Sequence, residues 1–138
     1  MMKMEENSVY HIPVLFEESI SGLDIQNDSV IVDVTFGGGG HSKEILNRLG
    51  DDGVLVAFDQ DEDALDNIPE DDRLVFVESN FRILYNWVKY HELLPVDGLL
   101  ADLGVSSHQF NEGERGFSIR EEGVLDMRMN QQSDLTAY

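Results

Sequence analysis

The chain has 138 residues, and its 9 basic and 28 acidic side chains give a formal net charge of −19. Its length suits one domain, and its hydrophobic fraction of 41% is enough to form a core, so the acidity does not indicate general disorder. The charge argues against a simple basic surface for nucleic acid or for an anionic membrane. Because the chain has no cysteine, disulfide frameworks, thiolate zinc sites and cysteine nucleophiles are excluded.

The N-terminal segment, residues 1–28, is expected to carry one amphipathic helix, because Phe16, Ile20 and Leu23 recur at helical spacing. Its first residues lack the apolar stretch of a signal peptide, and no apolar run in the chain approaches the roughly 20 residues that span a bilayer. We therefore expect a cytoplasmic protein without a membrane partner.

Strands and helices are predicted to alternate through residues 29–103. Short apolar, β-branched runs that are typical of buried strands occupy residues 30–34, 54–58, 74–77 and 96–103. The alternation predicts βαβ units, and therefore an α/β fold with a parallel sheet. The intervening helices are expected on the stripe Ile45, Leu46 and Leu49, on a short segment from Asp61 to before Pro69, and on the stripe Phe81, Leu84, Tyr85 and Val88.

The third part of the chain, residues 104–138, is expected to be a long loop near the active site. Glycine, serine and asparagine punctuate its start, and it has no sustained apolar period. Three of its residues, Arg115, Arg120 and Arg128, are candidates for phosphate contacts. Salt bridges within the loop are the alternative, because five acids lie among these arginines. The acids are Glu112, Glu114, Glu121, Glu122 and Asp126.

A glycine-rich turn, residues 37–40, follows the first predicted strand and leads into His41 and Ser42. Ligands of open parallel sheets bind at the carboxyl ends of the strands, where glycines admit a ligand close to the backbone and free amides at a helix start favour an anion. A plain tight turn is the alternative interpretation.

Two phosphate-binding patterns fit this turn poorly. The Walker pattern requires lysine where this chain has His41, and the dinucleotide pattern that starts at Gly37 meets Ser42 at its third glycine. The mismatch disfavours a nicotinamide dehydrogenase. What remains is a nucleoside-like ligand whose anionic part is a single carboxylate.

Two further predicted strands end in an acid. Asp59 lies 18 positions beyond His41, near the spacing at which such folds place the acid that accepts hydrogen bonds from a ribose diol. A solvated surface charge is its alternative. Asp102 would either hold an adenine or a substrate amine, or cap the turn that follows it.

Five segments of the chain together resemble one protein family. They are His11 to Leu15, Thr35 to Ser42, Asp102 to Ser107, Glu114 to Ser118 and Leu125 to Met129. From about Tyr10 to its end the chain is similar to the bacterial ribosomal RNA small subunit methyltransferase H family, also called MraW. The resemblance implies a Rossmann-like class I S-adenosylmethionine-dependent methyltransferase fold. It also implies methylation of the exocyclic N4 of a cytidine in 16S ribosomal RNA, at the decoding centre of the small ribosomal subunit.

The resemblance also implies which residues hold S-adenosyl-L-methionine. It places Gly39, Gly40 and His41 around the methionyl part, Asp59 on the ribose, Phe81 beside the adenine, and Asp102 and Gln109 at further contacts. For Phe81 a core position on its helical stripe is the alternative. The four histidines show no metal-ligand spacing, so no metal is expected.

The catalytic residue is left unknown, with Asp102 as the candidate. An exocyclic amine is a poor nucleophile that needs alignment and a proton acceptor. Many amino-methyltransferases place an aromatic shortly after the acid of the fourth strand, whereas Asp102 is followed by Leu103 and Gly104. An aromatic that holds the cytosine would therefore come from elsewhere, with Phe110 and Phe117 as candidates.

By the same resemblance the chain is expected to be an amino-terminal half, with about four of the seven strands usual for this class of sheet. The outer edge of the fourth strand would then favour self-association, which makes a homodimer an expected partner state. The alternative function is a non-catalytic module that binds a nucleoside or S-adenosylmethionine, or assists assembly, without methyl transfer.

The acidity is concentrated in one segment. Ten of the 28 acids lie between Asp51 and Asp72, with no basic residue among them. Only Asp59 in this segment is given a functional role, and the other nine are interpreted as a solvated, repulsive edge. An RNA-binding surface is therefore expected from the loop after Asp102, or from sequence outside this chain.

Overall fold

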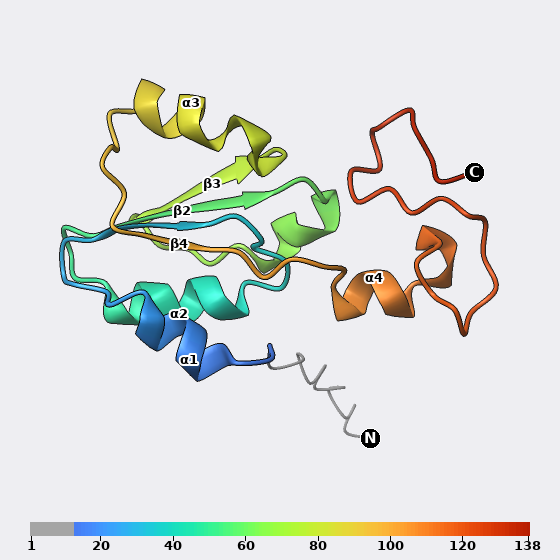
Figure 1. The fold of residues 1–138 in the computed structure, drawn as a ribbon, viewed down its shortest axis with the longest axis horizontal. Helices are drawn as coiled ribbons and strands as arrows, with labels where there is room; N and C mark the ends of the chain where they lie inside the picture. Colours follow the sequence, from blue (N-terminus) through green and yellow to red (C-terminus); the bar gives the residue numbers. More distant parts are fainter. Residues whose placement is uncertain (1–12) are drawn as a thin grey trace, which may run out of the picture.

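A computed structural model describes residues 13–138, and their strands form a four-stranded parallel sheet (Figure 1). The spatial order is β3-β2-β1-β4, so the chain steps outward from β1 through β2 to β3 and then crosses back to the other side of β1. This parallel arrangement was predicted from the alternation of strands and helices. The strands are β1 Val30–Asp33, β2 Val54–Asp59, β3 Leu74–Glu78 and β4 Gly98–Leu100.

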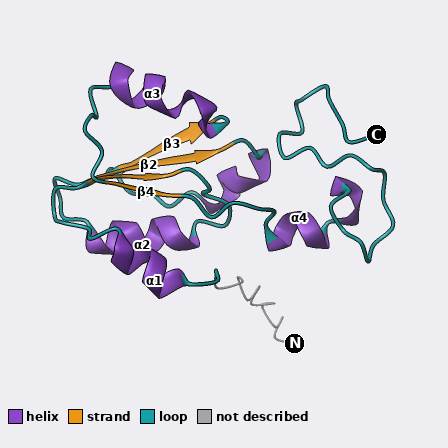
Figure 2. Cartoon of the chain, viewed as in Figure 1, coloured by secondary structure: helices purple, strands orange, loops and turns teal. Residues whose placement is uncertain are grey.

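Helices cover both faces of the sheet. α1 (Phe16–Gly22) and α2 (Gly40–Arg48) lie on one face, and α3 (Leu84–Tyr90) lies on the other, as Figure 2 shows. The 3-10 segments η1 (Glu62–Asn67) and η2 (Phe81–Ile83) follow β2 and β3. No helix in the described part of the chain is long and apolar enough to cross a membrane.

The core consists of two layers, because successive strand residues point to opposite faces. Ile31 and Leu55 pack with the helices α1 and α2, whereas Val32 and Val56 pack with Val88 of α3. All four strand residues are fully buried. This two-sided burial explains why the strand sequences are nearly continuous in apolar residues rather than alternating.

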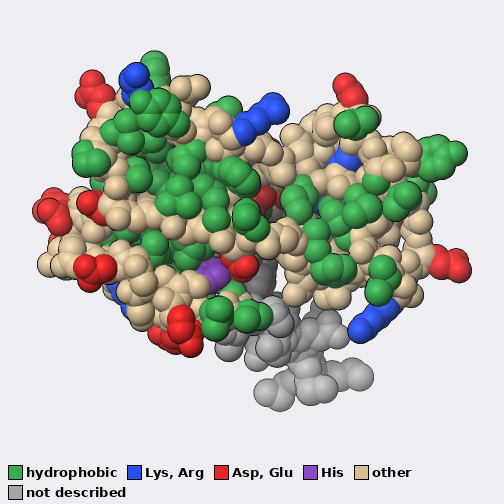
Figure 3. All heavy atoms as spheres, in the orientation of Figure 1, with side chains coloured by type: hydrophobic (Ala, Val, Ile, Leu, Met, Phe, Trp, Pro, Cys, Tyr) green, Lys and Arg blue, Asp and Glu red, His purple; other side chains and the backbone are tan. Residues whose placement is uncertain are grey.

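The fourth strand is shorter than predicted. Its ladder ends at Leu100, whose carbonyl oxygen accepts a hydrogen bond from the Val34 N–H. Beyond that point β1 has already turned, and the Asp102 N–H donates instead to the Thr35 hydroxyl at 2.8 Å. β4 is an edge strand among the described residues, and Figure 3 shows hydrophobic side chains spread over the half of the molecule that holds the sheet.

The loop prediction for residues 104–138 is wrong at its start. α4 (Ser107–Asn111) and the 3-10 turn η3 (Gly113–Arg115) occupy it. α4 begins with a capping box, in which the Ser106 hydroxyl accepts from the Gln109 N–H and the Gln109 side chain accepts from the Ser106 N–H. This Ser-x-x-Gln pattern was visible in the sequence and is a known helix-start signal. The division of the chain at residues 28 and 103 stays a prediction.

Gly39 is the glycine that the turn after β1 requires. It precedes α2 with a φ of +77°, and a Cβ there would meet the Phe36 ring at 2.9 Å and the Asn67 carbonyl oxygen at 3.3 Å. Gly40 differs, because a Cβ would meet nothing closer than Pro13 at 3.9 Å. Only the first of these neighbouring glycines is therefore demanded by the fold.

We expect Gly39→Ala to lower the free energy of unfolding by about 2 kcal/mol or more, because a left-handed backbone and a clash with a buried ring act together. Gly40→Ala is the matched control and should stay within about 0.5 kcal/mol of the wild type, since it lies in a helix with free space around it. Urea denaturation followed by circular dichroism measures both. Equal destabilisation by the two substitutions would contradict the assignment.

Candidate functional site

The candidate site lies where the strand order reverses, between the carboxyl ends of β1 and β4. Open α/β sheets bind their ligands in the crevice at this switch point. A cavity of about 310 Å³ is found there, with His41 at the start of α2 on one side and Asp102 after β4 on the other. The remaining lining residues are Val14, Leu15, Ser19, Leu100 and Ala101.

The Asp33 carboxylate holds the turn beside this cavity in place through hydrogen bonds. It ends β1 and is completely buried, and its carboxylate accepts hydrogen bonds from the Ser42 hydroxyl at 2.7 Å and from the Thr35 N–H at 3.0 Å. Burial raises the pKa of Asp33 against the effect of these donors. Sequence reasoning assigned Asp33 no role, although an acid that ends an otherwise apolar strand was a usable signal. The Thr35 hydroxyl also accepts a hydrogen bond from the Asp102 N–H, so the ends of β1 and β4 are linked.

His41 is the buried polar group of the cavity. Only 6% of the residue is exposed, and its ring stacks on Phe16 with centroids 5.1 Å apart. Its Nε2 atom is buried and has no hydrogen-bond partner among the described residues. A buried polar atom without a partner is costly, so a ligand in the cavity that His41 lines would satisfy it.

Asp59 ends β2 and faces the glycine turn. Its two carboxylate oxygens accept hydrogen bonds from the Gly37 N–H at 2.7 Å and from the Asp61 N–H at 2.9 Å. Burial raises the pKa of this carboxyl, and the backbone donors act in the opposite direction. A carboxylate offers about four lone-pair sites, so after the backbone donors of Gly37, Asp61 and Gln60 it can still accept a further hydrogen bond. Asp59 is therefore fixed in place and still able to accept from a ligand hydroxyl.

Phe81 follows β3 at the same edge of the sheet, and the core alternative for it is wrong. The residue is 42% exposed, because a 3-10 turn starts here and shifts Phe81 off the helical stripe that buries Val88. Asn80 caps this turn and also donates to the Gln60 side chain at 3.1 Å, which links the end of β3 to the end of β2.

The side chains of Asp102 and Gln109 differ in their exposure and in their hydrogen bonds. The Asp102 side chain is exposed in the cavity wall and makes no hydrogen bond within residues 13–138. The Gln109 side chain is buried away from that cavity, and its amide nitrogen donates to Asp61 at 2.7 Å. The role predicted for Gln109 as a cofactor contact stays a prediction.

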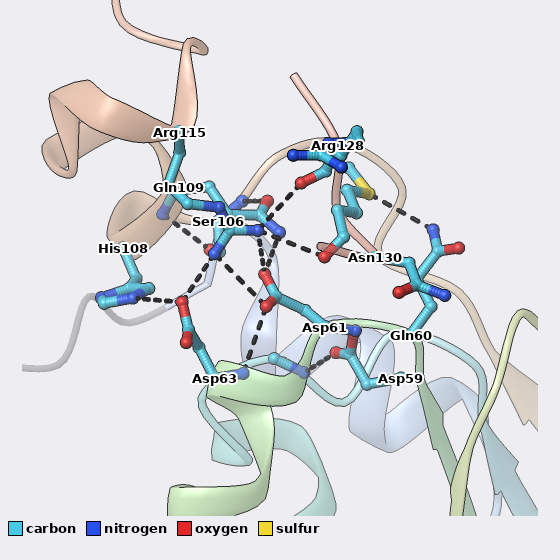
Figure 4. Close-up of polar contacts among 12 residues, drawn as sticks. Asp59, Gln60, Asp61, Asp63, Ser106, His108, Gln109, Arg115, Arg128 and Asn130 are labelled. Carbon is cyan, nitrogen blue, oxygen red and sulfur yellow. Dashed lines mark hydrogen bonds and ion pairs between the residues drawn. The ribbon is translucent and has the colours of Figure 1, made fainter. Parts of the chain in front are cut away.

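A buried ion pair lies beside the candidate site (Figure 4). Arg115 of η3 donates to Asp61 at 2.7 Å and to Asp63 at 2.6 Å, and also to the carbonyl oxygens of Arg128 and Met129 at 3.1 and 3.2 Å. Only 4% of Asp61 is exposed. Burial acts to raise the pKa of Asp61, but the hydrogen bonds from Arg115 and Gln109 outweigh it and hold that pKa below its usual value.

This ion pair corrects two expectations. Asp61 belongs to the segment that was interpreted as a solvated edge, but it is buried and paired. Salt bridges do occupy two of the loop arginines, yet only Arg128 pairs within the loop, with Asp126 at 2.7 Å. Arg115 reaches back 54 residues to Asp61. Pairing at that separation leaves no local signal in the sequence.

No group of three or more histidine, aspartate or glutamate side chains in the described residues could hold a metal ion. The two histidines near the candidate site act otherwise. His41 stacks on Phe16, and the His108 ring contacts the Asp63 carboxylate at 3.1 Å.

The sheet order, the glycine turn after β1 and the cavity at the switch point define a Rossmann-like class I S-adenosylmethionine-dependent methyltransferase fold. The chain belongs to the MraW methylase family, which it matches over residues 8–138.

Curated relatives carry the name ribosomal RNA small subunit methyltransferase H. The protein of Bacteroides fragilis is 59% identical over 133 residues, and that of Parabacteroides distasonis is 60% identical over 134 residues. Each match covers 96% of this chain and 44% of the relative. For Christiangramia forsetii the identity is 60% over 129 residues, which covers 94% of this chain and 43% of the relative. The chain thus spans less than half the length of these relatives.

We expect Arg115→Met to destabilise the chain by about 3 kcal/mol, because it leaves the Asp61 carboxylate buried without its counter-charge. Hydrogen exchange should show faster exchange of backbone amides in residues 107–129, which Arg115 holds against η1. Arg48→Met is the matched control: its ion pairs with Glu17 and Glu44 are partly exposed, and their loss should cost no more than about 1 kcal/mol. If Arg115→Met left exchange in this segment unchanged, the ion pair would not be what holds it.

Proposed function

We propose that this chain is the cofactor-binding part of an S-adenosylmethionine-dependent methyltransferase that acts on 16S ribosomal RNA, at the exocyclic N4 of a cytidine in the decoding centre. The family and the names of the relatives support the reaction and the class of RNA. The observation that carries the proposal is the cavity at the switch point, where within residues 13–138 a buried His41 nitrogen lacks a partner and the Asp102 carboxylate makes no hydrogen bond.

The residues present fit S-adenosylmethionine. The His41 nitrogen and the Asp102 carboxylate suit the polar end of an amino acid, and the open space beside Gly40 leaves the backbone accessible. Gly39 shapes the same turn. Asp59 keeps lone pairs for a ribose diol, the exposed ring of Phe81 suits the adenine, and the remaining amide hydrogen of Gln109 is proposed as a further contact. When bound, the cofactor supplies an electrophilic methyl group.

The chain itself must orient the amine and accept its proton. Because the lone pair of an exocyclic amine is delocalised into the ring, attack requires close alignment and an acceptor for the proton that leaves. Asp102 is the proposed acceptor, since its carboxylate is exposed at the switch point and its backbone is fixed by Thr35. Among the described residues that line this cavity, Asp102 is the only acid.

The proposed partner is the small ribosomal subunit or its 16S RNA, which places the reaction in the cytoplasm. A second copy of the chain is a further proposed partner, through the edge strand β4, where Leu99 is 48% exposed. The alternative function is a module that binds S-adenosylmethionine without transferring methyl groups.

We expect calorimetry to show S-adenosylmethionine binding that Asp59→Ala weakens roughly 10- to 100-fold, the effect of losing hydrogen bonds to a charged group. Asp66→Ala is the matched control, because Asp66 is an exposed acid of the same segment. Melting temperatures verify that both variants are folded. Tighter binding of NAD than of S-adenosylmethionine, or equal affinity of the Asp59 and Asp66 variants, would count against the proposed cofactor site.

We expect methyl transfer to small subunits that lack the modification, with N4-methylcytidine identified by mass spectrometry of the digested RNA. At saturating S-adenosylmethionine, Asp102→Asn should lower the rate at least about 100-fold, the usual contribution of a positioned base, and calorimetry measures any loss of cofactor affinity separately. Asp134→Asn, an exposed acid of the C-terminal segment, is the control. Cofactor binding without any transfer would favour the module instead.

A further inference from the structure

A second cavity lies outside the candidate site, between α4 and the turn that follows η3. Its volume is about 420 Å³. Its lining combines an aromatic ring, a guanidinium group, an amide and a carboxylate, on residues that the proposed function has not used. They are Phe110, Asn111, Ser118, Ile119, Arg120 and Glu121.

Among the arginines of the C-terminal segment, Arg120 is the one whose guanidinium group is accessible to a ligand. Arg115 is buried in its ion pair with Asp61, and Arg128 is held by Asp126. The Arg120 side chain is exposed and makes no hydrogen bond or ion pair within residues 13–138. Of the three arginines that were candidates for phosphate contacts, Arg120 is the one without an ion pair in the part of the chain that the structure describes.

Phe110 is the aromatic ring that is left for a base. Phe117, the other candidate, is only 9% exposed, whereas Phe110 is 45% exposed on α4. The neighbouring Gln109 anchors α4 to Asp61, which fixes the helix that carries Phe110. On the opposite wall, the Ser118 hydroxyl accepts hydrogen bonds from the N–H groups of Arg120 and Glu121 at 3.1 Å. The first wall is therefore anchored to Asp61, and the second wall is a local turn that the Ser118 hydroxyl closes.

We propose that this cavity binds one nucleotide of single-stranded RNA, with Phe110 stacked on the base and Arg120 paired with a phosphate. Single-stranded RNA is recognised by stacking on aromatic side chains and by cations along the backbone. The Glu121 carboxylate suits an exocyclic amino group of the base, and the Asn111 amide can both donate and accept.

The proposal rests on the proposed function for its choice of RNA. Because the cavity is distinct from the one at the switch point, the nucleotide it holds is one that flanks the methylated cytidine rather than the cytidine itself.

The test is fluorescence anisotropy of a labelled single-stranded RNA oligonucleotide at low salt, with no S-adenosylmethionine present. Phe110→Ala should weaken binding roughly 5- to 100-fold, the range for loss of one stacked base. Arg120→Gln should weaken binding and reduce the slope of log affinity against log salt by about 0.7, the value for one phosphate contact to a single strand. The matched controls, Tyr90→Ala and Lys89→Gln on α3, should bind as the wild type does.

Three results would overturn the proposal. One is wild-type affinity in both Phe110→Ala and Arg120→Gln. Another is equal binding of a duplex of the same sequence, whose paired bases are not free to stack. The third is competition by an acidic peptide as strong as that by unlabelled RNA, which would indicate a protein partner.

S-adenosylmethionine calorimetry on the same variants separates this proposal from the proposed function. Unchanged cofactor affinity with weakened RNA binding supports the cavity as an RNA site. Cofactor binding with RNA affinity that is insensitive to both substitutions contradicts the cavity alone, whereas a chain that binds RNA through Phe110 but no cofactor contradicts the proposed function alone.

Discussion

The buried ion pair between Arg115 and Asp61 is the interaction on which the arrangement of the sheet's carboxyl edge depends. Taking two charges out of water is unfavourable unless further hydrogen bonds accompany the pair. Here the pair has them: Asp61 also accepts from Gln109, and Arg115 also donates to Asp63 and to two backbone carbonyls. The Arg115 Nε atom is buried without a partner in the described residues, and this cost reduces the net stabilisation from the pair. The main effect of the pair is therefore to fix the positions of the segments that it joins.

This pair connects the two proposed sites of the chain through a single residue. The Asp61 backbone N–H donates to Asp59, the acid proposed for the ribose, while the Asp61 carboxylate holds η3 and α4. The segment that carries Phe110 and Arg120 is thus anchored two residues from a proposed cofactor ligand. Any movement that withdrew Arg115 would leave an unpaired buried carboxylate beside Asp59, so the anchored arrangement is the favoured one.

The parts of the fold that were predicted from sequence are those with a local cause. The four strands were found because residues such as Ile31 and Val32 are buried on opposite faces, which yields continuous apolar runs. The turn before α2 was found from its glycines, and the structure shows that Gly39 is the one the backbone needs. The start of α4 also had a local signal, the capping box at Ser106 and Gln109, which was overlooked.

The parts that were missed depend on distant contacts. Asp61 looks like its acidic neighbours until the partner 54 residues away is known, and the exposure of Phe81 follows from a 3-10 turn that breaks the helical period. β4 stops at Leu100 because its partner β1 has turned, which the β4 sequence does not record.

The net charge limits how this chain can bind RNA in the proposed complex. Of its nine basic residues, Arg48, Arg73, Arg115 and Arg128 are paired with acids in the described residues, so few cations remain against 28 acids. Affinity through release of counterions grows with the number of phosphates neutralised, and this chain can neutralise few. Stacking does not depend on net charge, because every base offers a π face. In the proposed RNA complex, this chain would therefore gain more of its affinity from exposed rings such as Phe110 than from its cations, and we expect its binding to depend only weakly on salt.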